Sequence, residues 1–194
     1  MKKDLTIILA SNSPRRRDIL RQIGIDFVQS PVDLDEKINP GELPEDYAGR
    51  VSLDKARIAA AKAGSGIIIA ADTIVALENR ILGKPADAID AQRMLRLLSG
   101  RMHRVITGLT VMDAATGKTV TRTSITKVWF RELAAQEIDS YVASGEPLDK
   151  AGAYGIQGKG ALLVDRIEGC YFNVVGLPLT VLGGILRDFG IAIL

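Results

Sequence analysis

Two short apolar runs, Leu5–Ala10 and Ile67–Ala71, constrain the fold of this chain most strongly. Neither run alternates between apolar and polar residues, which is typical of a β-strand that is buried on both faces. A helix start follows the first run, because Ser13 is a preferred N-cap residue and Pro14 suits the first helical position. The chain is therefore expected to have an α/β fold.

The remaining segments alternate between helix and strand patterns. After the helix that begins at Pro14, further helices are predicted over Glu45–Ala63, Ala88–Leu98, Ala134–Ala143 and Leu179–Phe189. Besides the two apolar runs, the second of which continues to Val75, strands are predicted over Val105–Met112, Thr119–Phe130, Ala161–Ile167 and Tyr171–Val175. The turn Asp113–Gly117 indicates a hairpin within this order. A hairpin among α/β units implies a mixed sheet.

Length and charge exclude several classes of protein. A chain of 194 residues is interpreted as one domain, residues 1–194. The apolar run after Met1–Lys3 is shorter than a secretion signal requires, and no run is long enough to span a membrane, so no membrane partner is expected. A net charge of +2 and 5% aromatic residues argue against a nucleic-acid partner. The single cysteine, Cys170, and the single histidine, His103, exclude an intrachain disulfide and a multi-histidine metal site. Such cysteine usage fits a reducing, cytoplasmic location.

The first candidate site is the segment Ala10–Arg16. Ser11 follows a buried strand, and Arg15 and Arg16 stand in the first turn of a helix, where acidic residues are normally favoured. Backbone N–H groups, the serine hydroxyl and the guanidinium groups would all converge on a bound phosphate. The alternative interpretation is a solvated basic helix start, which suits Arg17 better than Arg15.

The second candidate is Asp72, which follows a strand that should be buried. A buried carboxylate needs a partner, a metal or a function, so Asp72 is a candidate general base or metal ligand. The alternative is an aspartate that caps a turn. Glu36 in an acidic loop, Lys55 in the long predicted helix and Lys84 on a tight turn carry weaker signals, and each of them suits a solvated side chain as well.

A glycine-rich stretch, Lys150–Gly160, is the third candidate. So much glycine between structured segments suggests a loop that approaches a ligand closely with its backbone, although a flexible turn remains the alternative. Gln157 within it has an amide that is able to bond a base edge in a bidentate fashion.

Six segments follow one another in an order that is typical of one family: Leu9–Arg16, Ala71–Val75, Gly83–Pro85, Met94–Gly108, Lys150–Gly158 and Asn173–Leu179. Through them nearly the whole chain resembles the Maf family of nucleoside triphosphate pyrophosphatases, also known as septum-formation inhibitors. The resemblance implies a two-lobed α/β fold around a long mixed sheet, related to inosine-triphosphate pyrophosphatases, with the active site in the central cleft. It also implies hydrolysis of a nucleoside triphosphate to the monophosphate and pyrophosphate, with Mg²⁺ or Mn²⁺ as the cofactor.

The resemblance also assigns roles to residues. Asp72 matches the catalytic proton acceptor, and Glu36 together with Asp72 matches groups around the metal. The substrate-binding positions that it implies are Ser11, Arg15, Arg16, Lys55, Thr73, Lys84 and Gln157. Among these, Arg15, Thr73 and Gln157 match the positions that select the substrate. The matches of Glu36 and Lys55 are looser, because less motif surrounds them.

The form of the glycine-rich segment that contains Gln157 resembles the branch of the family that acts on dTTP and UTP, and it leaves modified pyrimidine nucleotides open as further substrates. Homodimers are frequent in the family, which makes a homodimer one option here. A link to cell-division arrest is implied by the septum-inhibitor name. The alternative function is therefore a non-catalytic, nucleotide-binding regulator of septum formation.

Overall fold

The computed structural model describes residues 5–194, so the segment Met1–Lys3 lies outside the described residues. The chain forms two compact units. Unit 1 comprises the chain up to Asp72, Thr107–Ser124 and Gly176–Leu194, and unit 2 comprises Thr73–Ile106 and Ile125–Val175.

The strands form a seven-stranded mixed sheet, which confirms the predicted mixed α/β class. In chain order they are β1 (Ile7–Leu9), β2 (Val28–Gln29), β3 (Ile67–Leu77), β4 (Arg80–Leu82), β5 (Met102–Asp113), β6 (Thr119–Phe130) and β7 (Val164–Glu168). The hydrogen-bonded order is β2-β1-β3-β5-β6-β7, with β4 paired to β3. β1 runs parallel to β2 and β3, whereas β4 and β7 run antiparallel to their neighbours.

Six α-helices and three short 3₁₀ helices are described in residues 5–194. The α-helices are α1 (Pro14–Gln22), α2 (Pro44–Ala63), α3 (Ala88–Leu98), α4 (Ala135–Ala143), α5 (Tyr171–Val175) and α6 (Leu179–Asp188). The 3₁₀ helices are η1 (Glu146–Asp149), η2 (Ala151–Ala153) and η3 (Gly158–Leu163). No described helix is both long and apolar enough to cross a membrane.

Capping residues fix several helix ends where the sequence predicts them. The Ser13 side chain accepts a hydrogen bond from the backbone N–H of Arg16 and so caps α1. Gly64 adopts a left-handed conformation (φ 69°) and ends α2, because glycine has no Cβ that would oppose that conformation. The predicted helices over Glu45–Ala63 and Ala88–Leu98 are confirmed.

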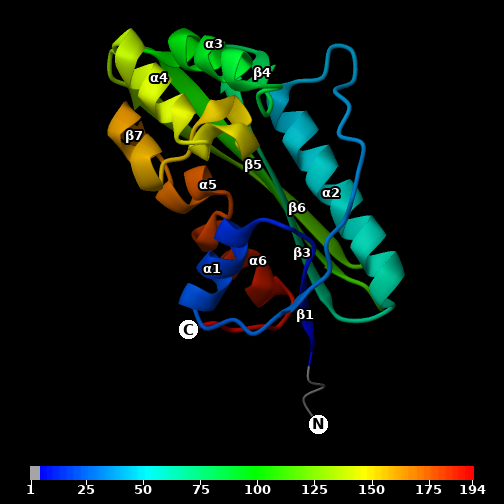
Figure 1. Cartoon of the computed structure of the whole chain (residues 1–194). Coiled ribbons are helices and arrows are strands. Elements are labelled where there is room, and N and C mark those ends of the chain that lie inside the picture. The colour runs from blue at the N-terminus through cyan, green and yellow to red at the C-terminus, as the bar shows by residue number, and fades with distance from the viewer. Residues whose placement is uncertain (1–4) are drawn as a thin grey trace. The chain divides into compact units, whose positions relative to one another are not determined.

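In unit 1, helix α2 packs on one face of β1 and β3, as Figure 1 shows in cyan beside the strands. The contact is made of small and branched apolar side chains from all three elements, namely Ile8, Ala10, Ala56, Ala59, Ile68 and Ala70. The β1–β3 register pairs Leu9 with Ile69, and the backbone N–H of Ala10 continues it by donating to Ile69. The residues that follow β1 therefore lie beside the segment of β3 that leads to Asp72.

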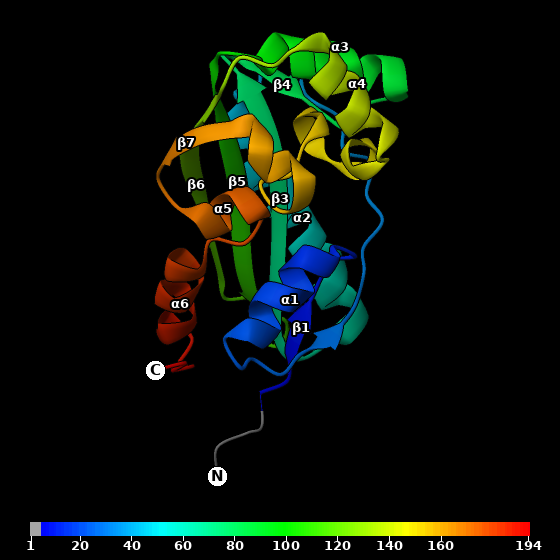
Figure 2. The same cartoon turned by 60° about the vertical axis from the view of Figure 1, so that its left-hand side comes forward.

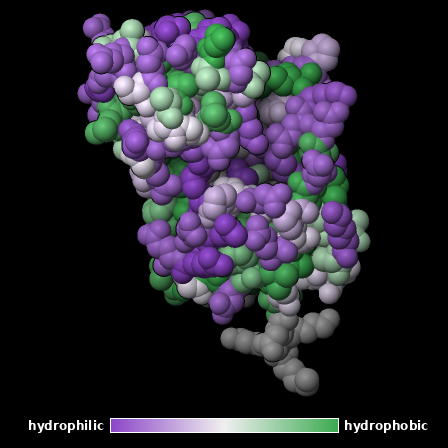
Figure 3. Space-filling view, viewed as in Figure 1, coloured by the Kyte–Doolittle hydropathy of each residue, from purple (hydrophilic) through white to green (hydrophobic). Residues whose placement is uncertain are grey.

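In unit 2, the apolar core gathers around Leu95 and Phe130 and includes residues of α3, α4 and the strands. Helices α3 and α4 lie side by side in both Figure 1 and Figure 2. The face of the molecule seen in Figure 3 carries mostly hydrophilic residues, in keeping with apolar side chains that are buried inside each unit.

The prediction of a strand over Tyr171–Val175 is wrong, because this segment forms helix α5. Its β-branched and aromatic residues favour a strand, but tertiary bonds override that preference. The buried Asn173 amide donates to the carbonyl oxygen of Val105 and to Oγ1 of Thr126, each at 3.0 Å. The N–H of Cys170 also donates to Thr126 Oγ1 at 3.0 Å, so two bonds from this segment end on one side chain of β6.

The prediction of a strand over Ala161–Ile167 is correct only in its second half. Residues Gly158–Leu163 form η3, and β7 begins at Val164. The carbonyl oxygen of Leu163 accepts a bond from the N–H of Arg131, which fixes the start of β7 beside the end of β6.

Candidate active site

A buried ion pair between Lys55 and Asp72 forms the centre of the site in unit 1. Lys55 Nζ lies 2.8 Å from Asp72 Oδ1 and 2.6 Å from Glu36 Oε1. Lys55 and Asp72 are only 9% and 6% exposed. Because charges removed from water require partners, the mutual pairing explains why both residues are tolerated in this position.

The alternation of β3 explains how these two side chains meet. Ile68 and Ala70 pack toward α2, and Asp72 follows them at the same two-residue spacing, so it projects from the same face of the strand. On α2, Lys55 lies four residues before Ala59, which belongs to that same contact, so the two side chains share a face of the helix. The carboxylate that follows the apolar run is thus buried against α2, and its function stays a prediction.

One oxygen of Asp72 is left without a partner. Oδ1 accepts from Lys55, whereas Oδ2 is buried and has no hydrogen bond. Buried polar atoms are nearly always paired, and the exceptions call for an explanation such as a catalytic role or a bound ion. An oxygen in this condition is available to accept a proton or to ligate a cation.

Side chains of α2 hold the acidic loop that carries Glu36. The Tyr47 hydroxyl donates to the backbone carbonyl of Glu36 at 3.1 Å. Arg50 donates to both carboxylate oxygens of Glu42, at 2.6 and 2.8 Å, and to the carbonyl of Lys37 at 2.8 Å. These bonds hold the loop at Glu36 and at two positions after it, so its exposed carboxylate is kept near Lys55.

Ser11 and Arg16 form the second part of the site. Ser11 Oγ accepts from the N–H of Ser13 at 3.1 Å and from Arg16 Nη1 at 3.2 Å. Arg16 Nε donates to the carbonyl oxygen of Gly176 at 2.8 Å. These bonds hold the Arg16 guanidinium at the N-terminal end of α1, where free backbone N–H groups favour an anion. Arg15 precedes it in the first turn and is half-buried.

Electrostatic effects link these groups. Burial lowers the pKa of Arg16 and the positive charge of Arg15 adds to this effect, whereas the negative charges of Asp72 and Glu36 act in the opposite direction. Burial, together with the same two carboxylates, raises the pKa of Tyr47 to about 12. The basic and acidic groups of unit 1 therefore influence one another electrostatically.

The donor set of this site fits a hard divalent cation. Within residues 5–194 no group of three or more His, Cys, Asp or Glu is placed to hold a metal. Two carboxylates, Glu36 and Asp72, meet at Lys55 Nζ. Mg²⁺ commonly takes one or two protein carboxylates and completes its shell with water and substrate phosphates. The two acids suit such an ion. They are too few to enclose a metal with protein ligands alone.

Three of the sequence-predicted residues belong to unit 2. Thr73 follows Asp72 in β3 and is half-buried. Lys84 is exposed in the segment between β4 and α3, and Gln157 is exposed directly before η3. Contacts within unit 1 bring together Lys55, Asp72 and Glu36, and also Ser11 and Arg16.

Sequence reasoning missed the residues that hold the acidic loop. Tyr47, Arg50 and Glu42 have no motif around them, and their pairing depends on how the loop folds back on α2. The one signal was that Tyr47 and Arg50 precede Lys55 on the same helix.

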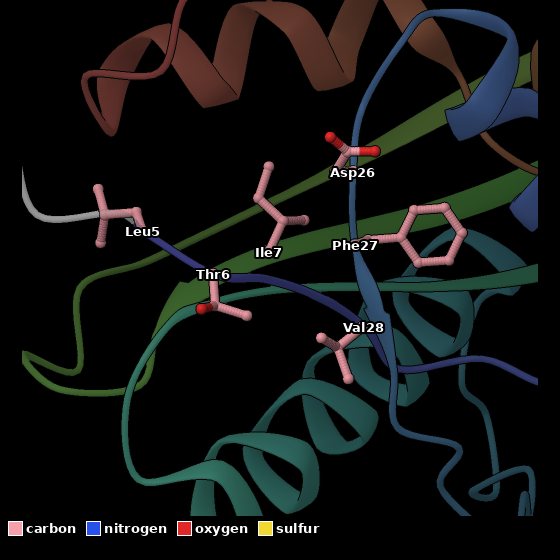
Figure 4. A pocket seen from close by; sticks show the side chains of 6 residues that line it. All are labelled: Leu5, Thr6, Ile7, Asp26, Phe27 and Val28. Carbon is pink, nitrogen blue, oxygen red and sulfur yellow. The ribbon is translucent and has the colours of Figure 1, made fainter.

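A hollow elsewhere in unit 1 contains none of the predicted site residues. It has a volume of about 360 Å³ and is lined by Leu5, Thr6, Ile7, Asp26, Phe27 and Val28 (Figure 4). Its lining is mostly apolar, with one carboxylate and one hydroxyl. Its residues carry no chemistry that would favour it over the Lys55–Asp72 site.

Known proteins resemble this chain along nearly its whole length. A family model described as Maf-like protein matches residues 6–189. A protein of Carboxydothermus hydrogenoformans named dTTP/UTP pyrophosphatase is 51% identical over 189 residues, which cover 96% of this chain and all of that protein. Two further proteins with the same name are similar to this chain. The one from Syntrophomonas wolfei is 48% identical, and the match covers 96% of this chain and 98% of that protein. The one from Dictyoglomus turgidum is 49% identical over the full length of this chain and of that protein. Among solved structures, a HAM1 protein from Coxiella burnetii aligns with a TM-score of 0.47 and 18% identity, over 65% of this chain and 73% of that chain.

Proposed function

This chain belongs to the Maf family, and from that premise we propose that it is a nucleoside triphosphate pyrophosphatase that hydrolyses dTTP and UTP to the monophosphate and pyrophosphate. Relatives named dTTP/UTP pyrophosphatase that match it along their full length support this activity. The structural observation that carries the proposal is the buried Asp72, whose Oδ2 is unbonded while Oδ1 is held by Lys55.

Asp72 acts as the general base of the proposed reaction. Its free Oδ2 accepts a proton from the attacking water, and the bond to Lys55 keeps the carboxylate in one orientation. Proton acceptance at a fixed atom matters, because small displacements of a catalytic group reduce the rate strongly.

The basic groups bind the triphosphate and stabilise the negative charge that spreads over it during the reaction. Arg15, Arg16 and the N-terminal end of α1 bind phosphate oxygens, with Ser11 as a further hydrogen-bonding group. Lys84, an exposed basic side chain, is proposed as a further substrate-binding residue. Arginine suits the role, because its planar guanidinium donates two parallel bonds to a phosphate.

A divalent cation, Mg²⁺ or Mn²⁺, belongs to the proposed function and would be held by Glu36 and Asp72. When bound, it supplies neutralisation of charge on the phosphate oxygens. Lys55, which contacts both carboxylates, keeps the two acids together and offsets their mutual repulsion.

Selection of the substrate is assigned to Arg15, Thr73 and Gln157. The Gln157 amide offers both a donor and an acceptor, which match the donor and acceptor groups on one edge of a pyrimidine. The exposure of Gln157 supports this role, since the side chain is accessible to a ligand.

The wider setting is also part of the proposal. We propose that residues 1–194 act as one functional domain, which is supported by a family model that extends over parts of both units. The single cysteine supports a cytoplasmic location, and the net charge of +2 supports a small nucleotide, not a nucleic acid, as the partner. A homodimer is proposed from the habit of the family, and light scattering of the purified protein tests it.

The activity is tested with a panel of nucleoside triphosphates, in which pyrophosphate and monophosphate are both quantified with Mg²⁺ and with Mn²⁺. We expect dTTP and UTP to yield the two products in equal amounts, ahead of purine triphosphates. Tight nucleotide binding without turnover under both metals would instead favour the regulator of septum formation.

A further inference from the structure

The loop that carries Gln157 is closed at its base by two side chains from outside it. We call Gly155–Gly160 the Gln157 loop. The N–H of Gly155 donates to the Tyr141 hydroxyl at 3.3 Å, and the N–H of Gly160 donates to Glu146 Oε1 at 3.0 Å. The Tyr141 hydroxyl in turn donates to the same Glu146 oxygen at 3.0 Å. Tyr141 and Glu146 therefore connect the first and last residues of the loop.

A further bond holds the chain next to Gln157. Glu146 Oε2 accepts from the N–H of Lys159 at 3.0 Å, so both carboxylate oxygens are used on the loop. Burial favours the neutral form of Glu146, but the bonds from Gly160, Lys159 and Tyr141 outweigh it, and the pKa of Glu146 lies below its ordinary value. A charged acceptor makes these hydrogen bonds stronger than neutral ones.

Close packing leaves the base of the loop little freedom. A Cβ on Gly160 would lie 2.2 Å from the Gly155 carbonyl oxygen and 2.5 Å from the Tyr141 hydroxyl, so only glycine fits there. On Gly158, a Cβ would lie 2.9 Å from Glu146 Oε2, and the φ of +67° also favours glycine. The chain after Gln157 thus depends on where Glu146 lies, and Gly155 before it depends on Tyr141.

The stem of the loop is fixed by a second buried pair. Tyr154 directly precedes the loop, and its hydroxyl lies 2.7 Å from His103 Nε2. Both residues are buried, and their rings meet edge to face with Phe130. Only the few residues around the exposed Gln157, between the fixed stem and the closed base of the loop, are therefore free to move.

We propose that Tyr141 and Glu146 are positioning residues that orient Gln157 and thereby set the preference of the enzyme for a pyrimidine base. They act through the loop and do not touch the substrate. The inference rests on the proposed function, because it assigns Gln157 to base selection. It goes beyond that function by naming the side chains on which the selection depends.

Two variants test the inference, each with a matched control. Tyr141→Phe removes only the hydroxyl, and Tyr171→Phe removes an exposed tyrosine hydroxyl elsewhere in unit 2. Glu146→Gln removes the charge and one acceptor, and Glu132→Gln makes the same change at an exposed site. Circular dichroism and thermal unfolding establish that each variant is folded. If one of the two test variants is unfolded, the other one tests the inference.

For both test variants we expect KM for dTTP to rise about tenfold with kcat changed by less than about threefold, because ground-state contacts are lost and the chemistry is not. The ratio of kcat/KM for dTTP over dGTP should fall by about the same factor. Amide exchange of Lys159 and Gly160, measured without nucleotide, should accelerate about tenfold or more. The two control variants should match the wild type in all three measurements.

Dissociation constants for dTMP and dGMP, measured by calorimetry, separate this inference from the proposed function because they require no turnover. If the wild type releases no pyrophosphate, the proposed activity is contradicted. If it nevertheless prefers dTMP and both variants lose that preference, the positioning role is supported. Unchanged selectivity in Tyr141→Phe and Glu146→Gln, whether or not the amides exchange faster, would overturn the positioning role. A wild type that binds dTMP no better than dGMP would overturn it as well.

Discussion

Lys55 Nζ donates to Asp72 Oδ1 at 2.8 Å, while Oδ2 of the same carboxylate is buried and makes no hydrogen bond. One oxygen of Asp72 is therefore bonded within the fold, and the other is not. This division accounts for a lysine within the buried stripe of α2, a position that an apolar residue would normally take.

Replacing Lys55 by methionine should destabilise the protein by about 3–5 kcal/mol, because Asp72 is then buried without its counter-charge. The double variant Lys55→Met with Asp72→Leu should regain much of this loss, since no unpaired charge remains. Urea unfolding of the two single variants and the double variant measures the difference. Equal stability of Lys55→Met and the wild type would show that the pair is not coupled.

Replacing Arg50 by lysine should loosen the acidic loop, because a lysine does not form the two parallel bonds to Glu42. Since the loop carries Glu36, the Mg²⁺ concentration for half-maximal activity should rise about threefold to tenfold. Arg57→Lys is the matched control, as Arg57 makes a surface ion pair on the same helix. An identical metal requirement in both variants would contradict the role of Arg50.

The buried His103 should make the free energy of unfolding depend on pH, in a pH range where few other groups titrate. Burial lowers the pKa of His103 to about 3, against an ordinary value of about 6.5. Between these values the unfolded chain binds a proton that the folded protein does not bind, so the free energy of unfolding falls as the pH falls. The stability that the protein has with a neutral His103 is fully present above about pH 6.5 and is lost progressively toward pH 3.

His103 is the only histidine in the chain, and carboxylates titrate mainly below pH 5, so the range from pH 6.5 to 5 isolates it. The wild type should lose about 1.5 kcal/mol of stability over this range. His103→Gln should be less stable at pH 7 but nearly flat over the same range. Chemical denaturation at several pH values gives both slopes, and parallel slopes would mean that His103 titrates normally.

Gly108 should not tolerate a side chain, because a Cβ there would lie 2.0 Å from the carbonyl oxygen of Ala48. Gly108→Ala should therefore cost more than about 3 kcal/mol, as β5 and α2 have to move apart. The matched change Gly183→Ala lies in α6 with open space around it and should stabilise the protein by about 0.5–1 kcal/mol. Thermal unfolding of the two variants checks the opposite signs.

Local sequence signals predicted much of the fold. The apolar runs that became β1 and β3, and the caps at Ser13 and Gly64, depend on interactions within a few residues. The segment Tyr171–Val175 was predicted wrongly, because its conformation depends on bonds from Asn173 to β5 and β6 that no local pattern reveals. The short strands β2 and β4 were not predicted, since two or three residues carry too little periodicity.

The candidate site divides in the same way. Asp72 was recognisable because a carboxylate directly after a buried strand is unusual, and the residues of the Ser11–Arg16 segment were recognisable from the helix start. The contact of Lys55 with Glu36 was not predictable from spacing, because the loop that brings them together is folded by Tyr47, Arg50 and Glu42. The same holds for the closed base of the Gln157 loop. Roles of all these residues in catalysis and binding stay predictions.

Release of pyrophosphate from dTTP by the wild type and by Asp72→Asn, at one Mg²⁺ concentration and with both proteins shown to be folded, tests the central claim most directly. The isosteric amide has no charge and is a poor proton acceptor. The rate of the variant should therefore fall by a factor of about 100 to 10,000, while dTTP still binds. A folded Asp72→Asn variant that keeps a tenth or more of the wild-type rate would contradict the assignment of Asp72 as the base. A wild type that releases only orthophosphate would contradict the proposed reaction itself.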